Sequence, residues 1–122
     1  MSIERDFHAT LAAHAPLTAL VATRIAQNAV PGGAAAPLVV YIATHNPTLG
    51  LDNTILADQC LLQTQCWGNT AAQADAVADA VQGAIATGLA AAAGAVVLDR
   101  ASAYDEELGM DGTVLTVEWW AT

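Results

Sequence analysis

The sequence predicts an α+β domain with a mostly antiparallel four-stranded sheet and helices packed on it. Residues 55–67 alternate between an apolar face and a glutamine-rich face, with the period of two of a strand. Residues 70–89 place apolar side chains three and four positions apart, as on one helix face. Alternating segments on both sides complete two hairpins, so the order is helix, strand, strand, helix, strand, strand.

The composition suits one small domain, which we expect to span residues 1–122. The hydrophobic fraction is 55%, but much of it is alanine, which buries little surface per residue. The core must therefore be built mainly from Leu, Val and Ile. A small core favours a subunit that gains stability by association with copies of itself.

The charge excludes some classes of partner. Three arginines against twelve acidic residues give a formal net charge of -9. Such a surface repels DNA phosphates and anionic lipids, which argues against a DNA-binding module or a basic membrane anchor. The chain starts with charged residues rather than the apolar run of a signal peptide, and no window has the length of a membrane span. We expect a soluble protein made in the cytoplasm.

The first third of the chain predicts two helices and a connection. Ile3, Phe7 and Leu11 share one face of a helix that begins at Ser2. Pro16 suits the first turn of a second helix over residues 17–25. Residues 26–37 hold several prolines and glycines and are expected to be irregular.

The first predicted hairpin leads to the central strand. Residues 38–44 are apolar on both sides, as in a strand that is covered on both faces or lies at a subunit contact. Residues 45–53 include Asn46, Pro47 and Gly50, which favour turns, so a long loop is expected there.

The central helix and the last hairpin follow. Asn69 or Thr70 is expected to cap the helix, and Gly88 is a plausible stop. Residues 95–104 alternate, with Val97 and Asp99 on one side and Arg100 on the other, and residues 113–120 alternate again. The helix stripe that should face the strands consists of Ala74, Val77, Ala78, Val81, Ile85 and Leu89.

Few residues suggest chemistry. Cys60 and Cys66 share one face of a strand but stand roughly 20 Å apart at about 3.3 Å per residue, beyond disulfide reach, so we interpret them as buried thiols. His8 and His14 miss the i, i+4 spacing of a helical metal pair. Nucleophile motifs and phosphate-binding glycine loops are absent from the sequence. We therefore predict no catalytic residue, no cofactor and no metal.

The acidic residues lead to two structural expectations, one for the turn 105–111 and one for Asp58. The turn 105–111 lacks the ligand spacing of a calcium loop and is expected to be a solvated hairpin tip. Asp58 stands on the apolar strand face, where an unpaired carboxylate would be costly. A structural ion pair with Arg100 or Arg24 is therefore expected.

Trp119 and Trp120 are neighbours in a predicted strand, so they point to opposite sides. One is expected in the core. The other is expected to be exposed or covered by a partner, unless helices of the same chain cover both.

Three landmarks occur in order along nearly the whole chain. The first is Leu17-Thr18-Ala19-Leu20-Val21 with Arg24-Ile25, then Pro31-Gly32-Gly33, then Pro37-Leu38-Val39-Val40-Tyr41. The second is Gln63-Thr64-Gln65-Cys66-Trp67 before a polar cap and an Ala- and Asp-rich helix. The third is an acidic hairpin that ends in Val117-Glu118-Trp119-Trp120. Together they resemble the tail completion or tail terminator family of tailed bacteriophages.

The resemblance implies a structural protein of the virion, placed at the neck of the tail. In that family the subunit forms a ring, commonly sixfold, at the head-proximal end of the tail tube. The ring stops tube polymerisation and offers a surface to the head connector or stopper. The partners implied are further copies of the chain, the tail tube protein and the head-side connector, while DNA passes through without specific binding. The resemblance implies no catalysis.

A ring needs two different patches that meet between neighbours. The loop 45–53, the glutamine face of the central strand and the last hairpin are the candidates, with the residues His45, Asn46, Leu49, Leu51, Asp52, Gln63, Gln65, Trp67, Trp119 and Trp120. The acidic candidates for the lumen are Asp105, Glu106, Glu107 and Asp111.

Two other interpretations remain open. The chain could be a head-side adaptor or stopper subunit of the neck. From another class, it could be a small α+β dimer that binds a metabolite or is an enzyme. A cofactor-free enzyme would need Asp58, His45 and Arg100 to converge.

Overall fold

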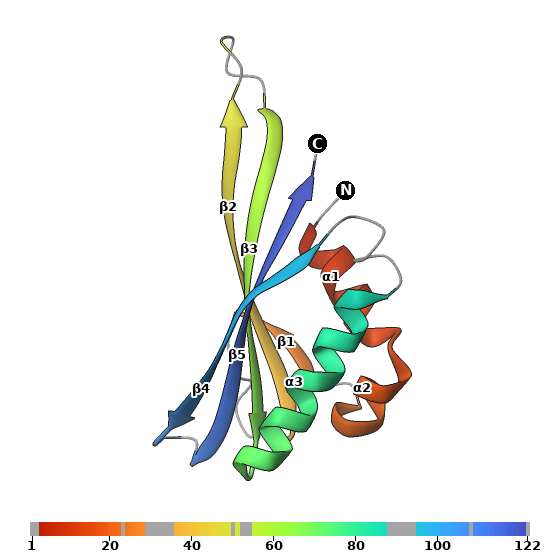
Figure 1. Cartoon of the computed structure of the whole chain (residues 1–122), viewed down its shortest axis with the longest axis vertical. Coiled ribbons are helices and arrows are strands. Elements are labelled where there is room, and N and C mark those ends of the chain that lie inside the picture. Colours follow the sequence, from red (N-terminus) through yellow and green to blue (C-terminus); the bar gives the residue numbers. More distant parts are fainter. Residues whose placement is uncertain are drawn as a thin grey trace.

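The computed structural model describes residues 3–22, 24–28, 36–49, 51, 55–87, 95–107 and 109–121. All the helices in these ranges lie on one face of a single sheet (Figure 1). None of them has the length and apolar character needed to cross a membrane. The elements are α1 (Ile3–Ala12), α2 (Ala15–Val21), β1 (Ile25–Gln27), β2 (Leu38–Leu49), β3 (Ile55–Gly68), α3 (Ala71–Ala86), β4 (Val96–Asp105) and β5 (Met110–Ala121).

The sheet has the strand order β1-β2-β3-β5-β4. β1 runs parallel to β2, and every other neighbouring pair is antiparallel. The predicted α+β class and the mostly antiparallel sheet are confirmed. The sheet has five strands rather than the four expected.

The extra strand corrects the prediction for residues 17–25. Helix α2 ends at Val21, and Ala22 adopts a positive φ of 53°, which takes the backbone out of the helix. Ile25 then pairs with Val39 as the first residue of β1. The partner of this strand lies in β2, so the local pattern of β1 could not reveal the pairing. Residues 29–35 of the predicted connection lie outside the described part of the chain.

The loop expected at residues 45–53 is mostly strand. β2 continues to Leu49 and β3 starts at Ile55, with His45 opposite Cys60 and Pro47 opposite Asp58. β1 pairs only with residues 39–41, so in the described chain this half of β2 has β3 on one side alone. A proline is tolerated on such an edge because its missing N–H is not needed there. The hairpin consequently projects past the helices (Figure 1).

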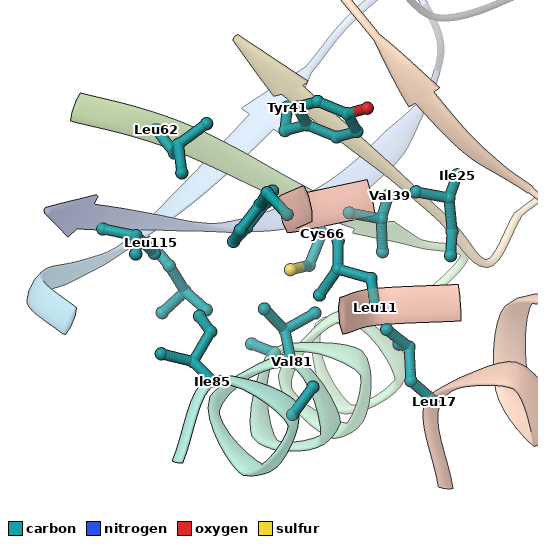
Figure 2. Close-up of a cluster of buried hydrophobic side chains, with 14 of the residues drawn as sticks. Leu11, Leu17, Ile25, Val39, Tyr41, Leu62, Cys66, Val81, Ile85 and Leu115 are labelled. Carbon is teal, nitrogen blue, oxygen red and sulfur yellow. The ribbon is translucent and has the colours of Figure 1, made fainter. Parts of the chain in front are cut away.

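The main core fills the space between the helices and the sheet (Figure 2). Cys60, Leu62 and Cys66 of the predicted apolar face of β3 are buried there. They belong to one cluster with the α3 residues Val77, Ala78, Val81 and Ile85. Trp119 belongs to this core, with its ring centroid 6.4 Å from that of Phe7 in an edge-to-face arrangement. Completely buried members include Phe7, Leu11, Leu17, Val21, Leu62, Val77, Val81, Leu115 and Val117.

Helix α3 begins as its sequence predicts. Thr70 is the N-cap, and its hydroxyl accepts a hydrogen bond of 3.1 Å from the Gln73 N–H. In return, the Gln73 side chain accepts one of 2.7 Å from the Asn69 N–H. These reciprocal bonds satisfy two amide groups at the strand-to-helix junction. The helix ends at Ala86, while Gly88 and Leu89 lie outside the described residues.

The alternation expected in β4 is interrupted by a β-bulge. The register of β4 on β5 shifts between Val97 and Asp99, which places Leu98 as an extra residue. Arg100 therefore faces the helices, where Nη1 donates to Asp79 Oδ1 at 2.8 Å and to Gln82 Oε1. The pKa of Arg100 is raised, mainly by the hydrogen bond to Asp79.

The two arginines expected as partners of Asp58 bind other groups in the described part of the structure. Besides Asp79, Arg100 faces Asp75 at 3.6 Å. Arg24 donates to backbone carbonyl groups, including that of Pro37 at 2.8 Å. The side chain of Asp58 lies outside the described part of the structure. Arg100 thus joins β4 to α3 instead of stabilising the central strand.

Candidate functional site

The face of the sheet away from the helices carries the glutamine row of β3. Gln65 donates to Gln63 at 3.5 Å, and the Trp67 indole N–H donates to Gln65 at 3.3 Å. Gln59 donates to Glu118 of β5 at 2.7 Å. The row therefore presents oriented polar groups, with Gln63 exposed and Gln65 partly exposed. Both were predicted as contact residues.

Three exposed apolar side chains lie on the neighbouring strands β4 and β5, and we define Val96, Leu98 and Trp120 as the apolar patch. Their exposed fractions are 47%, 54% and 45%. Trp120 is opposite Gln59 on β3, and Val96 is opposite Glu118 on β5, two residues before Trp120. Exposed apolar side chains that gather in this way are typical of surfaces covered by a partner. The sequence identified Trp120 as a contact candidate but not Val96 or Leu98. Their alternation predicts a strand, but it does not show that this strand lies at the edge of the sheet.

Trp67 and Trp119 are less available for contacts. Trp67 is only 6% exposed and packs with Leu38, Val40 and Met110 in a second, smaller core on the open face. Trp119 is 4% exposed in the main core. The two neighbouring tryptophans thus point to opposite sides of the sheet, as predicted, and Trp120 is the exposed one.

The β2–β3 hairpin holds several further contact candidates. Leu51 near its tip is fully exposed. In the stem, His45 donates a hydrogen bond to Glu4 of α1, and its ring lies close to Cys60. Asn46 and Leu49 belong to β2, although their side chains lie outside the described set, and so does all of Asp52.

The acidic turn joins β4 to β5 at the other end of the sheet from the tip of the β2–β3 hairpin (Figure 1). Gly109 has a φ of +65° and donates its N–H to the Asp105 carbonyl at 2.8 Å, which closes the turn. Glu106 and Glu107 are exposed, and Asp105 and Asp111 are partly buried. The four predicted lumen acids thus lie together on one protruding turn.

The residues of a possible enzyme do not converge. Arg100 on β4 and His45 on β2 are separated by two strands. That is about 14 Å across the sheet at roughly 4.8 Å per strand spacing. Their rows also differ by four residues along β5, about 13 Å at roughly 3.3 Å per residue. Each is hydrogen-bonded to a different helix, Arg100 to α3 and His45 to α1.

Comparisons with known proteins identify the family. The family model described as "Tail completion protein gp17" matches residues 5–122. The chain belongs to this family. None of the curated proteins compared with it matches. A chain of the solved structure titled "Virion of native gene transfer agent (GTA) particle" has a similar fold, with a TM-score of 0.72 and 22% identity over 98% of this chain and 93% of that chain.

Membership of the tail completion family confirms the resemblance seen in the sequence landmarks. The protein is a structural component of a bacteriophage-type virion, and its place is the neck region of the tail. Its functional surfaces are therefore expected to be contacts with other proteins.

Proposed function

We propose that this tail completion protein is the subunit of a six-membered ring that caps the head-proximal end of the tail tube. The ring stops tube polymerisation and offers its upper surface to the head connector. Membership of the family over nearly the whole chain carries this proposal. The subunit is one domain that performs no catalysis, in line with the separation of His45 from Arg100.

The two edges of the sheet suit a closed ring. In the described chain, β4 has β5 on one side only, and β2 beyond residue 41 has β3 on one side only. The two edges differ in sequence and surroundings, as a head-to-tail contact between neighbours requires. The apolar patch lies beside the β4 edge. We propose that this patch meets the hairpin stem of the next subunit, which carries His45, Asn46 and Leu49.

The remaining candidates occupy other positions in the ring. Gln63 and Gln65 supply directional hydrogen bonds near the centre of the open face. Leu51 near the hairpin tip, together with Asp52 that follows it in the sequence, is assigned to contacts with the tube or the connector. Trp67 and Trp119 support these surfaces from within the subunit, because both are buried.

The acidic turn is the part of the subunit that we assign to the lumen of the ring. If Asp105, Glu106, Glu107 and Asp111 line the lumen, they repel the phosphates of passing DNA. Binding would require neutralising phosphates with cations, and the whole chain has only three arginines and no lysine. DNA then passes the neck without being held.

Light scattering of the purified protein, alone and with assembled tail tubes, tests the proposal. The expected results are a mass of about six subunits, or a monomer that electron microscopy finds at one end of the tube only. A subunit found on the head side of the neck and never on tubes would identify an adaptor or stopper instead. A stable dimer indifferent to tubes would overturn the ring and favour a ligand-binding protein.

A further inference from the structure

The stem of the β2–β3 hairpin brings together three side chains of metal-ligating type. His45 and Cys60 are directly opposite in the ladder, which places their side chains on the same face of the sheet. Glu4 of α1 lies over this pair and accepts the hydrogen bond of His45 Nε2. The same nitrogen lies 4.0 Å from Cys60 Sγ. The three ligand atoms are all within 4.8 Å of one another.

We propose that Glu4, His45 and Cys60 form a binding site for a divalent transition-metal ion, with Zn²⁺ as the best match. Thiolate, imidazole and carboxylate are the ligand types of protein zinc sites. Bonds of about 2.0–2.3 Å to one tetrahedral ion would place these atoms roughly 3 to 4 Å apart. The three ligand atoms already lie within 4.8 Å of one another, close to this spacing.

The fourth position of the tetrahedron is open to water. The side chains of His45 and Glu4 are 38% and 21% exposed, whereas Cys60 is completely buried beneath them. An ion therefore enters from the solvent side, replaces the proton that His45 shares with Glu4, and is held from below by the sulfur. Binding also removes the thiol proton of Cys60, so affinity rises with pH.

The second cysteine has a different environment. Cys66 lies on the same face of β3, but the metal-ligating cluster in the described residues does not include it. Burial raises the pKa of its thiol to about 12. Cys66 stays protonated and matches Cys60 in strand, face and burial, which makes it an internal control.

An ion at this site would join three elements. α1, β2 and β3 each supply one ligand, so the metal fixes the N-terminal helix to the base of the projecting hairpin. The site exists only in the folded register, since Glu4 and His45 are distant in sequence, and binding therefore stabilises the folded state.

Titration of the full-length protein with Co²⁺, followed by competition with Zn²⁺, tests the site. Wild type is expected to develop thiolate-to-cobalt charge-transfer absorption that Zn²⁺ abolishes, and Zn²⁺ is expected to raise its melting temperature. His45→Gln and Glu4→Gln, at partly exposed positions, should each weaken binding by at least about tenfold. Cys60→Ala should remove the charge-transfer band.

Two matched variants are the controls. Cys66→Ala removes the other buried thiol of the strand. His8→Gln removes a histidine of α1 that contacts the Tyr41 hydroxyl at 3.1 Å instead. Both should bind Co²⁺ like wild type. Absence of the band in wild type, or equal binding by His45→Gln and His8→Gln, would overturn the proposal.

Discussion

The indole ring of Trp67 lies directly over Gly112, its cross-strand partner on β5. A β-carbon at position 112 would come within 2.6 Å of the ring atom Cζ3. The glycine therefore provides the space that lets Trp67 cover the smaller core on the open face of the sheet.

Gly112→Ala is expected to destabilise the protein by roughly 1–3 kcal/mol, because overpacking forces the indole out of its position. Denaturation in urea with tryptophan fluorescence measures the change. In a Trp67→Leu background, Gly112→Ala should lower the free energy of unfolding by a much smaller amount. An equal cost in both backgrounds would show that the backbone conformation at 112, rather than the ring, demands glycine.

Substitutions of the two adjacent tryptophans are expected to affect different properties, stability for Trp119 and association for Trp120. Trp119→Ala should cost about 3–5 kcal/mol, since it empties a site in the main core beside Phe7. Trp120→Ala should change the free energy of unfolding by less than about 1 kcal/mol, as expected for a partly exposed side chain. On the proposed ring, however, Trp120→Ala should weaken association. Urea denaturation and light scattering of each variant test these opposite outcomes, and unchanged ring mass in Trp120→Ala would remove the apolar patch from the interface.

The stability of the protein should fall at alkaline pH. Burial raises the pKa of the Cys66 thiol to about 12, and the charge of Arg100 lowers it by a smaller amount. An unfolded cysteine titrates near about 8.5, so the stabilising contribution is complete below that pH and decreases as the pH rises toward the folded value. The slope due to Cys66 should approach about 1.4 kcal/mol per pH unit.

Comparison of wild type with Cys66→Ala between about pH 8 and 10 isolates this effect. The pKa of Tyr41 is also raised, by burial and then by the charge of Glu4, but this contribution is common to both proteins. Parallel curves for the two proteins would contradict the assignment to Cys66.

Reversing the charge of the acidic turn tests the lumen. Particles with Asp105, Glu106 and Glu107 replaced by lysine should assemble but eject DNA more slowly, because each lysine attracts the phosphates that the acid repels. A neutral variant, in which the same three acids are replaced by their amide counterparts, should lie between this variant and wild type. Ejection rates measured over a range of salt concentrations would show the expected screening. Identical rates in all three particles would place the turn away from the DNA.

The local patterns were sufficient for the central part of the fold. The alternation of β3, the apolar stripe of α3 and the cap at Thr70 are encoded within neighbouring residues, and all three were predicted. By contrast, β1 has only three residues and is stabilised by its parallel pairing with β2. Asn46 and Pro47 favour turns locally, but the ladder to β3 overrides this preference.

The same reason explains why the cluster of Glu4, His45 and Cys60 was missed. The cluster forms because the strand register places His45 opposite Cys60. The sequence predicts a loop at residues 45–53, and a loop has no fixed strand partner that would bring His45 to Cys60. The exposed or partly exposed positions of Gln63, Gln65 and Trp120 could be predicted better, because they follow directly from the alternation of β3 and β5. The exposure of Val96 and Leu98 could be recognised only once β4 was known to lie at the edge of the sheet.

The bulge at Leu98 has a consequence for solubility before assembly. An uninterrupted edge strand is a template on which further chains can add indefinitely, which leads to aggregation. The extra residue breaks the regular spacing of backbone donors and acceptors along β4, so a passing strand can pair with only part of this edge. We expect this irregularity to let the subunit carry an open edge at high concentration without forming fibres.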